Sequence, residues 1–336
     1  MLDAEVPIAP ASHQEPVGGQ LKTPALESFS PSQPTESKGP RAAGVVVRKK
    51  PDSEDWPQQT KPKLYLTAQM DSVETVRCGG GTVVAFSRRS PEKDTPNEDA
   101  AAIFPLWPGA AVLVVADGVG GMKNGSKASA TAIRAFKRTL AEVRSEQDLR
   151  NTMLDAIERA NTGVMRHCSG SATTIAAVEI NNGYLRGYHV GDSTIMQVSA
   201  RGQIKWLALA HAPVSYAIEA GVLTEEEGML HPERNLVANV VGDREMFIEI
   251  GPRRKIGVQD TIILASDGLG DNLATDEVAD QVRRNPLSDR VAELITEASA
   301  RMMPPIHGGP QNVPGKADDL TALVYRPERR RKRRSK

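Results

Sequence analysis

Two runs of apolar residues, each as long as a buried β-strand, end in the same pair of residues. The first, residues 111–116 (AVLVVA), leads into Asp117, and the second, residues 261–265 (TIILA), leads into Asp267 after one serine. A glycine follows each aspartate. A short continuous apolar run predicts a strand with both faces covered, and a following glycine lets other groups approach the backbone closely. We therefore expect a layered fold in which two buried strands each present a carboxylate at one edge.

More carboxylates stand beside predicted strands. Glu98 and Asp99 come just before a strand that begins near Ala100. Asp318 likewise precedes a predicted strand, and Asp192 follows one. A strand that runs antiparallel to its neighbour starts at the edge where that neighbour ends. The pattern therefore predicts that all these carboxylates meet at one end of the sheets.

We expect such a cluster of carboxylates to bind a cation. Carboxylates without countercharges repel one another and resist removal from water. Ligation by oxygen alone selects hard metals, and Mg²⁺ or Mn²⁺ fits better than Ca²⁺ because both keep several water ligands. Taken alone, each Asp-Gly pair is also typical of an ordinary turn at the end of a strand. Their recurrence at several strand edges favours the metal centre.

The hydrophobic periodicity between these motifs alternates between helix and strand. Apolar positions at steps of three and four predict amphipathic helices, and short apolar runs separated by Asn-Gly or Gly-Asp predict antiparallel hairpins. The predicted helices cover residues 126–143, 147–166, 275–284 and 287–302, and the predicted strands cover residues 82–86, 100–106, 172–180, 184–190, 194–199 and 320–325. Strands grouped together and helices grouped in pairs indicate an α+β fold built in layers.

Composition divides the chain into three parts. Ten of the 23 prolines fall within residues 1–62, and few large apolar side chains accompany them, so we expect residues 1–70 to form a disordered extension. Residues 71–325 carry 26 basic and 33 acidic side chains and are expected to form the folded domain. Residues 326–336 hold eight basic side chains and one glutamate. This basic tail is interpreted as a docking element for an acidic partner, with a merely solvated tail as the alternative.

Three further features limit the possible functions and the cellular location. The net charge is zero, which argues against a specific nucleic-acid binder that is basic throughout. Cys78 and Cys168 are the only cysteines, too few for a disulfide framework, so a reducing compartment is expected. The acidic N-terminus does not resemble a signal peptide, and no apolar run approaches the ~18 residues of a membrane span. We expect a cytoplasmic protein without a transmembrane segment.

Taken together, the motifs resemble those of the metal-dependent protein phosphatases of type 2C, in particular the bacterial-like serine/threonine phosphatases. In order along the chain they are Asn97-Glu98-Asp99, VADGVGG at 115–121, SATTIAAV at 171–178, HVGDST at 189–194, LASDGL at 264–269 and DDLTALVY at 318–325. Residues 221–243 are similar to the family segment that carries a mobile flap. The resemblance implies a four-layer sandwich of two antiparallel β-sheets flanked by pairs of α-helices.

The resemblance also implies a two-metal centre with assigned ligands. Asp117 would bridge both metals. The carbonyl of Gly118 and a water held by Glu98 would serve one metal, and Asp267 and Asp318 would serve the other. The implied reaction is hydrolysis of phosphoserine and phosphothreonine in proteins, by direct attack of a water that bridges two Mn²⁺ or Mg²⁺ ions. The implied partners are phosphorylated proteins in signalling, where the enzyme would counter a serine/threonine kinase.

Other positions receive more limited roles from the resemblance. Asp99 would orient metal-bound water, and Asp192 matches the position that binds a third, weaker metal in some members. Asp319 stands where many relatives have asparagine and adds negative charge without removing a ligand. For His211, which lacks the acidic residue that often precedes the family's histidine, we expect a structural role.

Two departures concern the phosphate and the leaving group. Asp94 stands where bacterial-type members usually carry a phosphate-binding arginine. We expect Arg88 or Arg89 to bind the phosphate instead, with Lys93 as an alternative. Val119 replaces the general-acid histidine of some members, so protonation of the leaving group would fall to a water. These departures keep an alternative open: a catalytically weak regulatory module of the same fold that binds phosphoproteins without turning them over.

Overall fold

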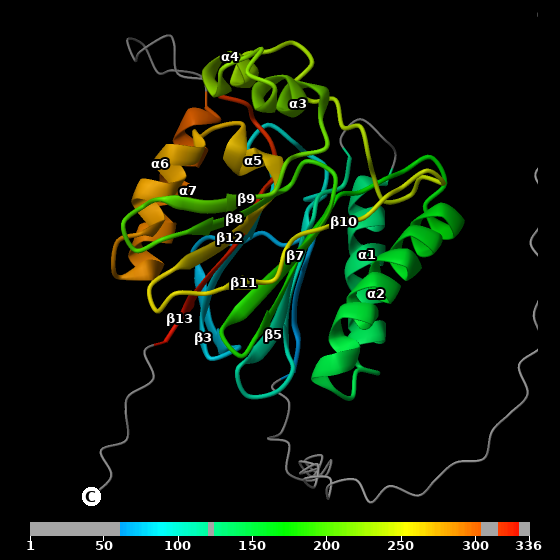
Figure 1. The fold of residues 1–336 in the computed structure, drawn as a ribbon. Helices are drawn as coiled ribbons and strands as arrows, with labels where there is room; N and C mark the ends of the chain where they lie inside the picture. The colour runs from blue at the N-terminus through cyan, green and yellow to red at the C-terminus, as the bar shows by residue number, and fades with distance from the viewer. Residues whose placement is uncertain (1–60, 120–123, 304–314, 329–336) are drawn as a thin grey trace, which may run out of the picture. The chain divides into compact units, whose positions relative to one another are not determined.

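The computed structural model describes residues 61–119, 124–303 and 315–328. Its strands form two antiparallel sheets (Figure 1). In spatial order the first sheet contains β1 (Lys63–Leu66), β4 (Ala100–Pro105), β5 (Ala110–Ala116), β6 (Ile175–Asn181), β7 (Tyr184–Val190) and β10 (Glu249–Ile250), with β11 (Arg254–Lys255) also paired to β7. The second contains β2 (Glu74–Cys78), β3 (Gly81–Arg88), β13 (Leu320–Pro327), β12 (Thr261–Ala265), β8 (Thr194–Val198) and β9 (Ile204–Leu207).

Helices cover the outer faces of both sheets. In Figure 1, α1 (Gly125–Leu140) and α2 (Glu146–His167) lie along the first sheet, and α6 (Thr275–Val282) and α7 (Leu287–Arg301) lie along the second. The short helices α3 (Pro213–Glu219), α4 (Glu225–Met229) and α5 (Asp267–Gly270) lie near the end of the second sheet where β12 terminates. The predicted four-layer α+β sandwich is thereby confirmed.

The apolar runs behave as their patterns predict because each strand packs on both sides. In β5, Val112 and Val114 face α1 and α2, whereas Leu113 and Val115 face the other sheet. In β12, alternate side chains face the other sheet or α6 and α7 in the same way. A strand with both faces covered in this manner needs no polar positions. The core therefore consists of three apolar layers, one between the sheets and one under each helix pair.

The two predicted domain boundaries are corrected. Residues 63–66, assigned to the disordered extension, form β1 and pair with β4, and this pairing buries Tyr65. A strand of four residues is too short to show a period of its own. Arg326, assigned to the basic tail, belongs to β13, and its buried guanidinium donates to Thr261 Oγ1 (2.9 Å) and to the Arg284 carbonyl (2.9 Å). Residues 1–60 of the predicted extension and residues 329–336 of the predicted tail lie outside the described residues.

Among the described residues, none of the helices combines the length and the apolar character that a membrane crossing requires.

Candidate metal centre

The predicted carboxylates come together at one end of the two sheets. Asp117 directly follows β5, and Asp267 begins α5 just after β12. Burial, followed by the charges of Asp99, Asp267, Asp192 and Asp318, raises the pKa of Asp117 well above its ordinary value. These interactions show that five acidic side chains from five separate chain segments share one region. The convergence expected from the strand edges is therefore present in the structure.

Two threonines and a serine hold the backbone at Asp117. The Asp117 carbonyl accepts hydrogen bonds from Thr173 Oγ1 (2.7 Å) and from the Thr174 N–H (2.8 Å). The Asp117 N–H donates in turn to Thr174 Oγ1 (3.0 Å). Thr174 Oγ1 also bonds Ser193 Oγ (2.6 Å), next to Asp192. The predicted strand over residues 172–180 is shorter in the structure and begins at Ile175, directly after the two threonines that bond Asp117.

Two glycines leave room for the predicted ligands Glu98 and the Gly118 carbonyl. A Cβ placed on Gly125 would lie 2.5 Å from Glu98 Oε1 and 3.1 Å from the Gly118 carbonyl oxygen. A Cβ placed on Gly118 would lie 2.5 Å from the Gly125 carbonyl oxygen. Ser129 Oγ donates to the Glu98 carbonyl (2.6 Å) and fixes that segment. The oxygens of Glu98 and Gly118 thus lie next to space that a side chain larger than glycine at position 118 or 125 would fill.

Asp319 connects two loops of the centre. Its Oδ1 accepts the Ser90 N–H (2.7 Å), and its Oδ2 accepts the Glu98 N–H (2.7 Å). The side chain is 3% exposed. The sequence showed this residue only as an added negative charge. The structure shows that Asp319 sets the path of the chain into Glu98, a role that no local pattern could reveal because the partners lie 221 and 229 residues away.

Asp99 carries an unpartnered oxygen. Ser266 Oγ donates to Asp99 Oδ2 (2.7 Å), whereas the buried Oδ1 has no hydrogen-bond partner in the described part of the chain. Burial, followed by the charge of Asp319, raises the pKa of Asp99 to about 8. A buried carboxylate oxygen without a partner is costly unless a cation or an ordered water satisfies it.

Two lysines supply positive charge to this centre. Lys93 Nζ lies 3.3 Å from Glu98 Oε2, 3.4 Å from Asp318 Oδ1 and 3.2 Å from Asp319 Oδ2. Lys316 Nζ makes ion pairs with another set of carboxylates that includes Asp318 Oδ2 (2.9 Å). Burial alone would lower the pKa of each lysine, but the surrounding carboxylates raise both pKa values above the ordinary range. Sequence reasoning named Lys93 only as an alternative and missed Lys316.

Asp271 also belongs to the centre and was missed. It lies within 4.8 Å, ligand atom to ligand atom, of Asp267 and Asp318. Burial, followed by the charge of Asp267, raises the pKa of Asp271 to about 6. Its spacing of four residues from Asp267 was the available signal, since side chains at this spacing share one face of a helical turn.

Asp192 reaches the centre from the turn that follows β7. Burial, followed by the charge of Asp267, raises the pKa of Asp192 to about 7. The turn depends on Gly191, whose φ of +108° is rarely adopted by other residues. A Cβ added at Gly191 would lie 2.6 Å from Thr174 Cγ2. The predicted third-metal position is thus close to the predicted metal ligand Asp267.

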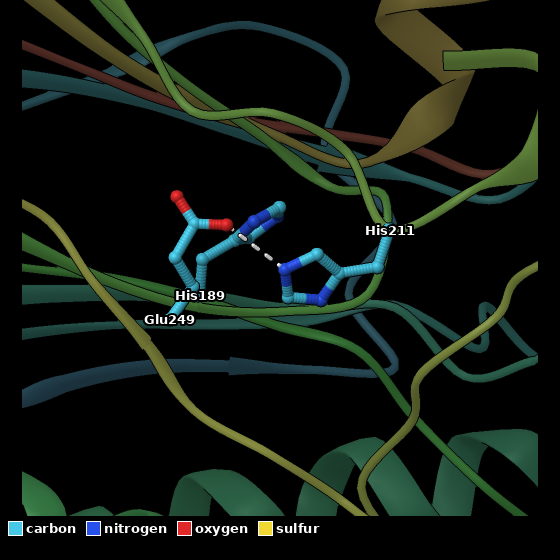
Figure 2. Close-up of side chains that lie close together, drawn as sticks. All are labelled: His189, His211 and Glu249. Carbon is cyan, nitrogen blue, oxygen red and sulfur yellow. Dashed lines mark hydrogen bonds and ion pairs between the residues drawn. The ribbon is translucent and has the colours of Figure 1, made fainter. Parts of the chain in front are cut away.

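A second group of possible ligands, His189, His211 and Glu249, adjoins this turn (Figure 2). The Gly191 N–H donates to His211 Nδ1 (3.2 Å), so Nε2 carries the proton and donates to Glu249 Oε2 (3.0 Å). A ring nitrogen that carries a proton has no lone pair for a metal. The hydrogen bonds therefore support the structural role expected for His211, namely holding the turn that carries Asp192.

The carboxylate cluster has the donor chemistry of a divalent-metal site. Its ligand atoms are oxygens throughout, its negative charges repel, and one buried oxygen of Asp99 has no partner. Hard cations such as Mg²⁺ and Mn²⁺ prefer such a set. The residues present therefore fit the ions that the motifs imply.

Comparison with known proteins identifies the family. Residues 88–303, well over half of the chain, match the family model described as Protein phosphatase 2C. The chain belongs to the protein phosphatase 2C family. This membership confirms the predicted resemblance and the predicted enzyme class, protein-serine/threonine phosphatase. The family is metal-dependent, in agreement with the donor set of the centre.

Similar proteins come from several bacteria. The serine/threonine phosphatase stp of Listeria welshimeri is 26% identical over 239 residues, which cover 65% of this chain and 87% of the relative. The solved serine/threonine phosphatase of S. agalactiae is 27% identical with a TM-score of 0.62 and covers 73% of this chain and 99% of its own. The catalytic domain of PstP, solved in complex with two manganese ions, shares the fold at 23% identity, a TM-score of 0.58 and coverage of 73% of this chain and 96% of its own.

Within this protein phosphatase 2C chain, the two candidate arginines bond groups that lie outside the carboxylate cluster. Arg88 Nη2 donates to Asp71 Oδ1 (2.9 Å), and Arg89 Nη1 donates to the carbonyls of Asp94 (3.3 Å) and Thr95 (3.5 Å). Of the three cations considered for phosphate binding, Lys93 is the one that contacts the cluster.

Proposed function

We propose that this protein phosphatase 2C member hydrolyses phosphoserine and phosphothreonine in proteins, using two Mn²⁺ or Mg²⁺ ions held by its carboxylate cluster. The observation that carries the proposal is the convergence of four acidic side chains, those of Asp99, Asp192, Asp267 and Asp318, around Asp117. The groups that would hold the ions are the carboxylates of Asp117, Asp267 and Asp318, the Gly118 carbonyl oxygen and Glu98 through a water, with Asp192 beside a third ion. Bound there, divalent ions lower the pKa of water and neutralise charge on phosphoryl oxygens.

The chain's own groups orient the reactants. Ser266 fixes one oxygen of Asp99, which leaves Oδ1 free to accept a hydrogen bond from the attacking water. This contact aligns the water for in-line displacement. Asp319 fixes the backbone of Glu98 and thereby the position of its carboxylate. Val119 offers no proton, so the leaving alkoxide would take its proton from water.

Phosphate capture falls to a cation in residues 88–93. Lys93 Nζ already contacts the cluster, whereas Arg88 would first have to leave Asp71. A substrate phosphate can take the place of a carboxylate as the partner of an ammonium group, since both are oxyanions. We therefore favour Lys93 over Arg88 and Arg89 as the phosphate-binding residue.

The test is release of phosphate from phosphothreonine peptides with Mn²⁺, with Mg²⁺ and with excess chelator. Asp117→Asn and Asp267→Asn should each lower the rate by orders of magnitude, because each removes a charged ligand. Asp276→Asn, an exposed change on α6, is the matched control and should keep full activity. Full activity in chelator, or in either of the first two variants, would show that the carboxylate cluster does not carry the reaction.

A weak regulatory module is the second candidate. The contacts of Lys93 and Lys316 with the carboxylates favour it, because positive side chains weaken metal binding. Under this alternative, the protein binds phosphothreonine peptides, but turnover stays low at saturating Mn²⁺. Binding and turnover measured on the same peptides separate the two functions.

For the physiological substrates we propose cytoplasmic proteins that a serine/threonine kinase phosphorylates. The proposal rests on family membership, because the similar proteins are serine/threonine phosphatases. Phosphopeptides derived from proteins phosphorylated by a co-purified kinase would test it.

A further inference from the structure

Lys316 lies among carboxylates assigned to one of the two ions. Its Nζ is 3.0 Å from Asp267 Oδ2, 2.7 Å from Asp271 Oδ2 and 2.9 Å from Asp318 Oδ2. The lysine side chain is 19% exposed, and the three carboxylates are 16–23% exposed. Such contacts differ from the pairs that form on an open surface, because little water is present to screen them.

Hydrogen bonds hold the backbone at Lys316 and thereby fix the position of its Cα. The Lys316 N–H donates to Asn272 Oδ1 (2.9 Å), and the Lys316 carbonyl accepts from Asn272 Nδ2 (2.9 Å). Asn272 is fully buried and also donates to the Gly268 carbonyl (2.9 Å). A Cβ on Gly315 would lie 2.2 Å from the Arg301 carbonyl oxygen, so the chain passes close to α7 at this point.

The ammonium group and a divalent ion need the same oxygens. A Mg²⁺ ion requires its ligand oxygens at 2.0–2.1 Å in nearly ideal geometry. An ion between Asp267 and Asp318 would therefore stand close to the present position of Nζ, and two positive centres repel strongly in a region with little water. Both oxygens of Asp318 are already paired with an ammonium group, because Oδ2 contacts Lys316 and Oδ1 contacts Lys93.

We propose that Lys316 is an internal counter-ion that competes with the divalent ion for Asp267 and Asp318. The lysine stabilises these carboxylates when no ion is bound, and it must leave them when an ion binds. It therefore lowers metal affinity and raises the stability of the ion-free protein. This inference rests on the proposed function only in requiring that divalent ions bind at these carboxylates.

The test uses Lys316→Met in the full chain, which removes the charge and keeps the length of the side chain. Free Mn²⁺ is measured by electron paramagnetic resonance during titration, which yields the number of bound ions and their affinities. We expect one of the bound ions to bind about tenfold more tightly than in the wild type, as loss of a close like charge predicts. Lys316→Arg keeps the charge and should retain the weaker affinity.

Lys127→Met is the matched control, because Lys127 is an exposed lysine in α1. Its affinity for Mn²⁺ should equal that of the wild type. In chelator, Lys316→Met should unfold a few degrees below the wild type, and saturating Mn²⁺ should abolish the difference. This stability measurement also shows whether the variant folds.

Two results would overturn the inference while leaving the proposed function intact. One is an unchanged Mn²⁺ affinity in Lys316→Met. The other is an equal gain of Mn²⁺ affinity in Lys127→Met, which would indicate a long-range electrostatic effect of net charge and not competition at the site. A wild type that binds no Mn²⁺ and works in chelator would instead refute the proposed function, and the competition with it.

Discussion

Replacing Gly125 by alanine should displace a predicted metal-centre group without removing any ligand. The new Cβ would lie 2.5 Å from Glu98 Oε1, whereas ordinary contact begins near 3.4 Å, so the carboxylate must retreat by roughly 0.9 Å. The Gly118 carbonyl oxygen, at 3.1 Å, must also yield slightly. A misplacement of about 1 Å in a reacting geometry lowers the rate by about 10²-fold.

The same change should leave the fold nearly as stable as before. Glu98 Oε1 is the end of a flexible side chain that is 17% exposed and can turn outward. Alanine is favoured over glycine in a helix by up to about 1 kcal/mol, which offsets part of the strain. We therefore expect the free energy of unfolding to change by less than about 1 kcal/mol. The loss should be catalytic and not structural.

The assay is hydrolysis of an aryl phosphate at saturating Mn²⁺, with thermal unfolding measured on the same preparations. Gly163→Ala in α2 is the matched control, since its Cβ meets only Thr131 Cγ2 at 3.1 Å. We expect kcat to fall by about 10²-fold in Gly125→Ala and to stay near the wild-type value in Gly163→Ala. A Gly125→Ala protein that folds normally and retains kcat within about twofold would refute the assigned position of Glu98.

In chelator, the protein should be more stable at pH 6 than at pH 8. The pKa values of Asp99, about 8, and of Asp192, about 7, in the folded protein exceed the ordinary carboxyl value. The folded state therefore binds more protons than the unfolded state, and the free energy of unfolding falls as pH rises. A melting temperature that rises between pH 6 and pH 8 would contradict the reasoning. Lys93→Ala should raise KM for phosphopeptides more than it lowers kcat, with Arg88→Ala as the comparison, and unchanged kinetics would return the role to the arginines. Deleting residues 329–336 should leave aryl phosphate turnover unchanged and weaken binding to anionic vesicles at low salt; equally tight binding would support a merely solvated tail.

Local patterns in the chain were sufficient for the strands that present the main carboxylates. The runs before Asp117 and Asp267 are apolar except for Thr261 because both faces of these strands are covered, and the aspartate follows within two residues. The long helices were predictable for a similar reason, since their buried side chains recur at helical spacing. β1 was missed because only its pairing with β4 stabilises so short a strand.

The order of residues along the chain was enough to predict that oxygen donors lie at strand ends and that a hard cation suits them. Which positive side chains face those donors depends on the folded structure. Lys93 lies 225 residues before Asp318, and its position depends on a loop braced by Asp319. Lys316 reaches Asp267 because Asn272 holds its backbone. Contacts between distant segments depend on the conformations of the loops that connect the elements of the core. The hydrophobic periodicity of the sequence does not predict these conformations.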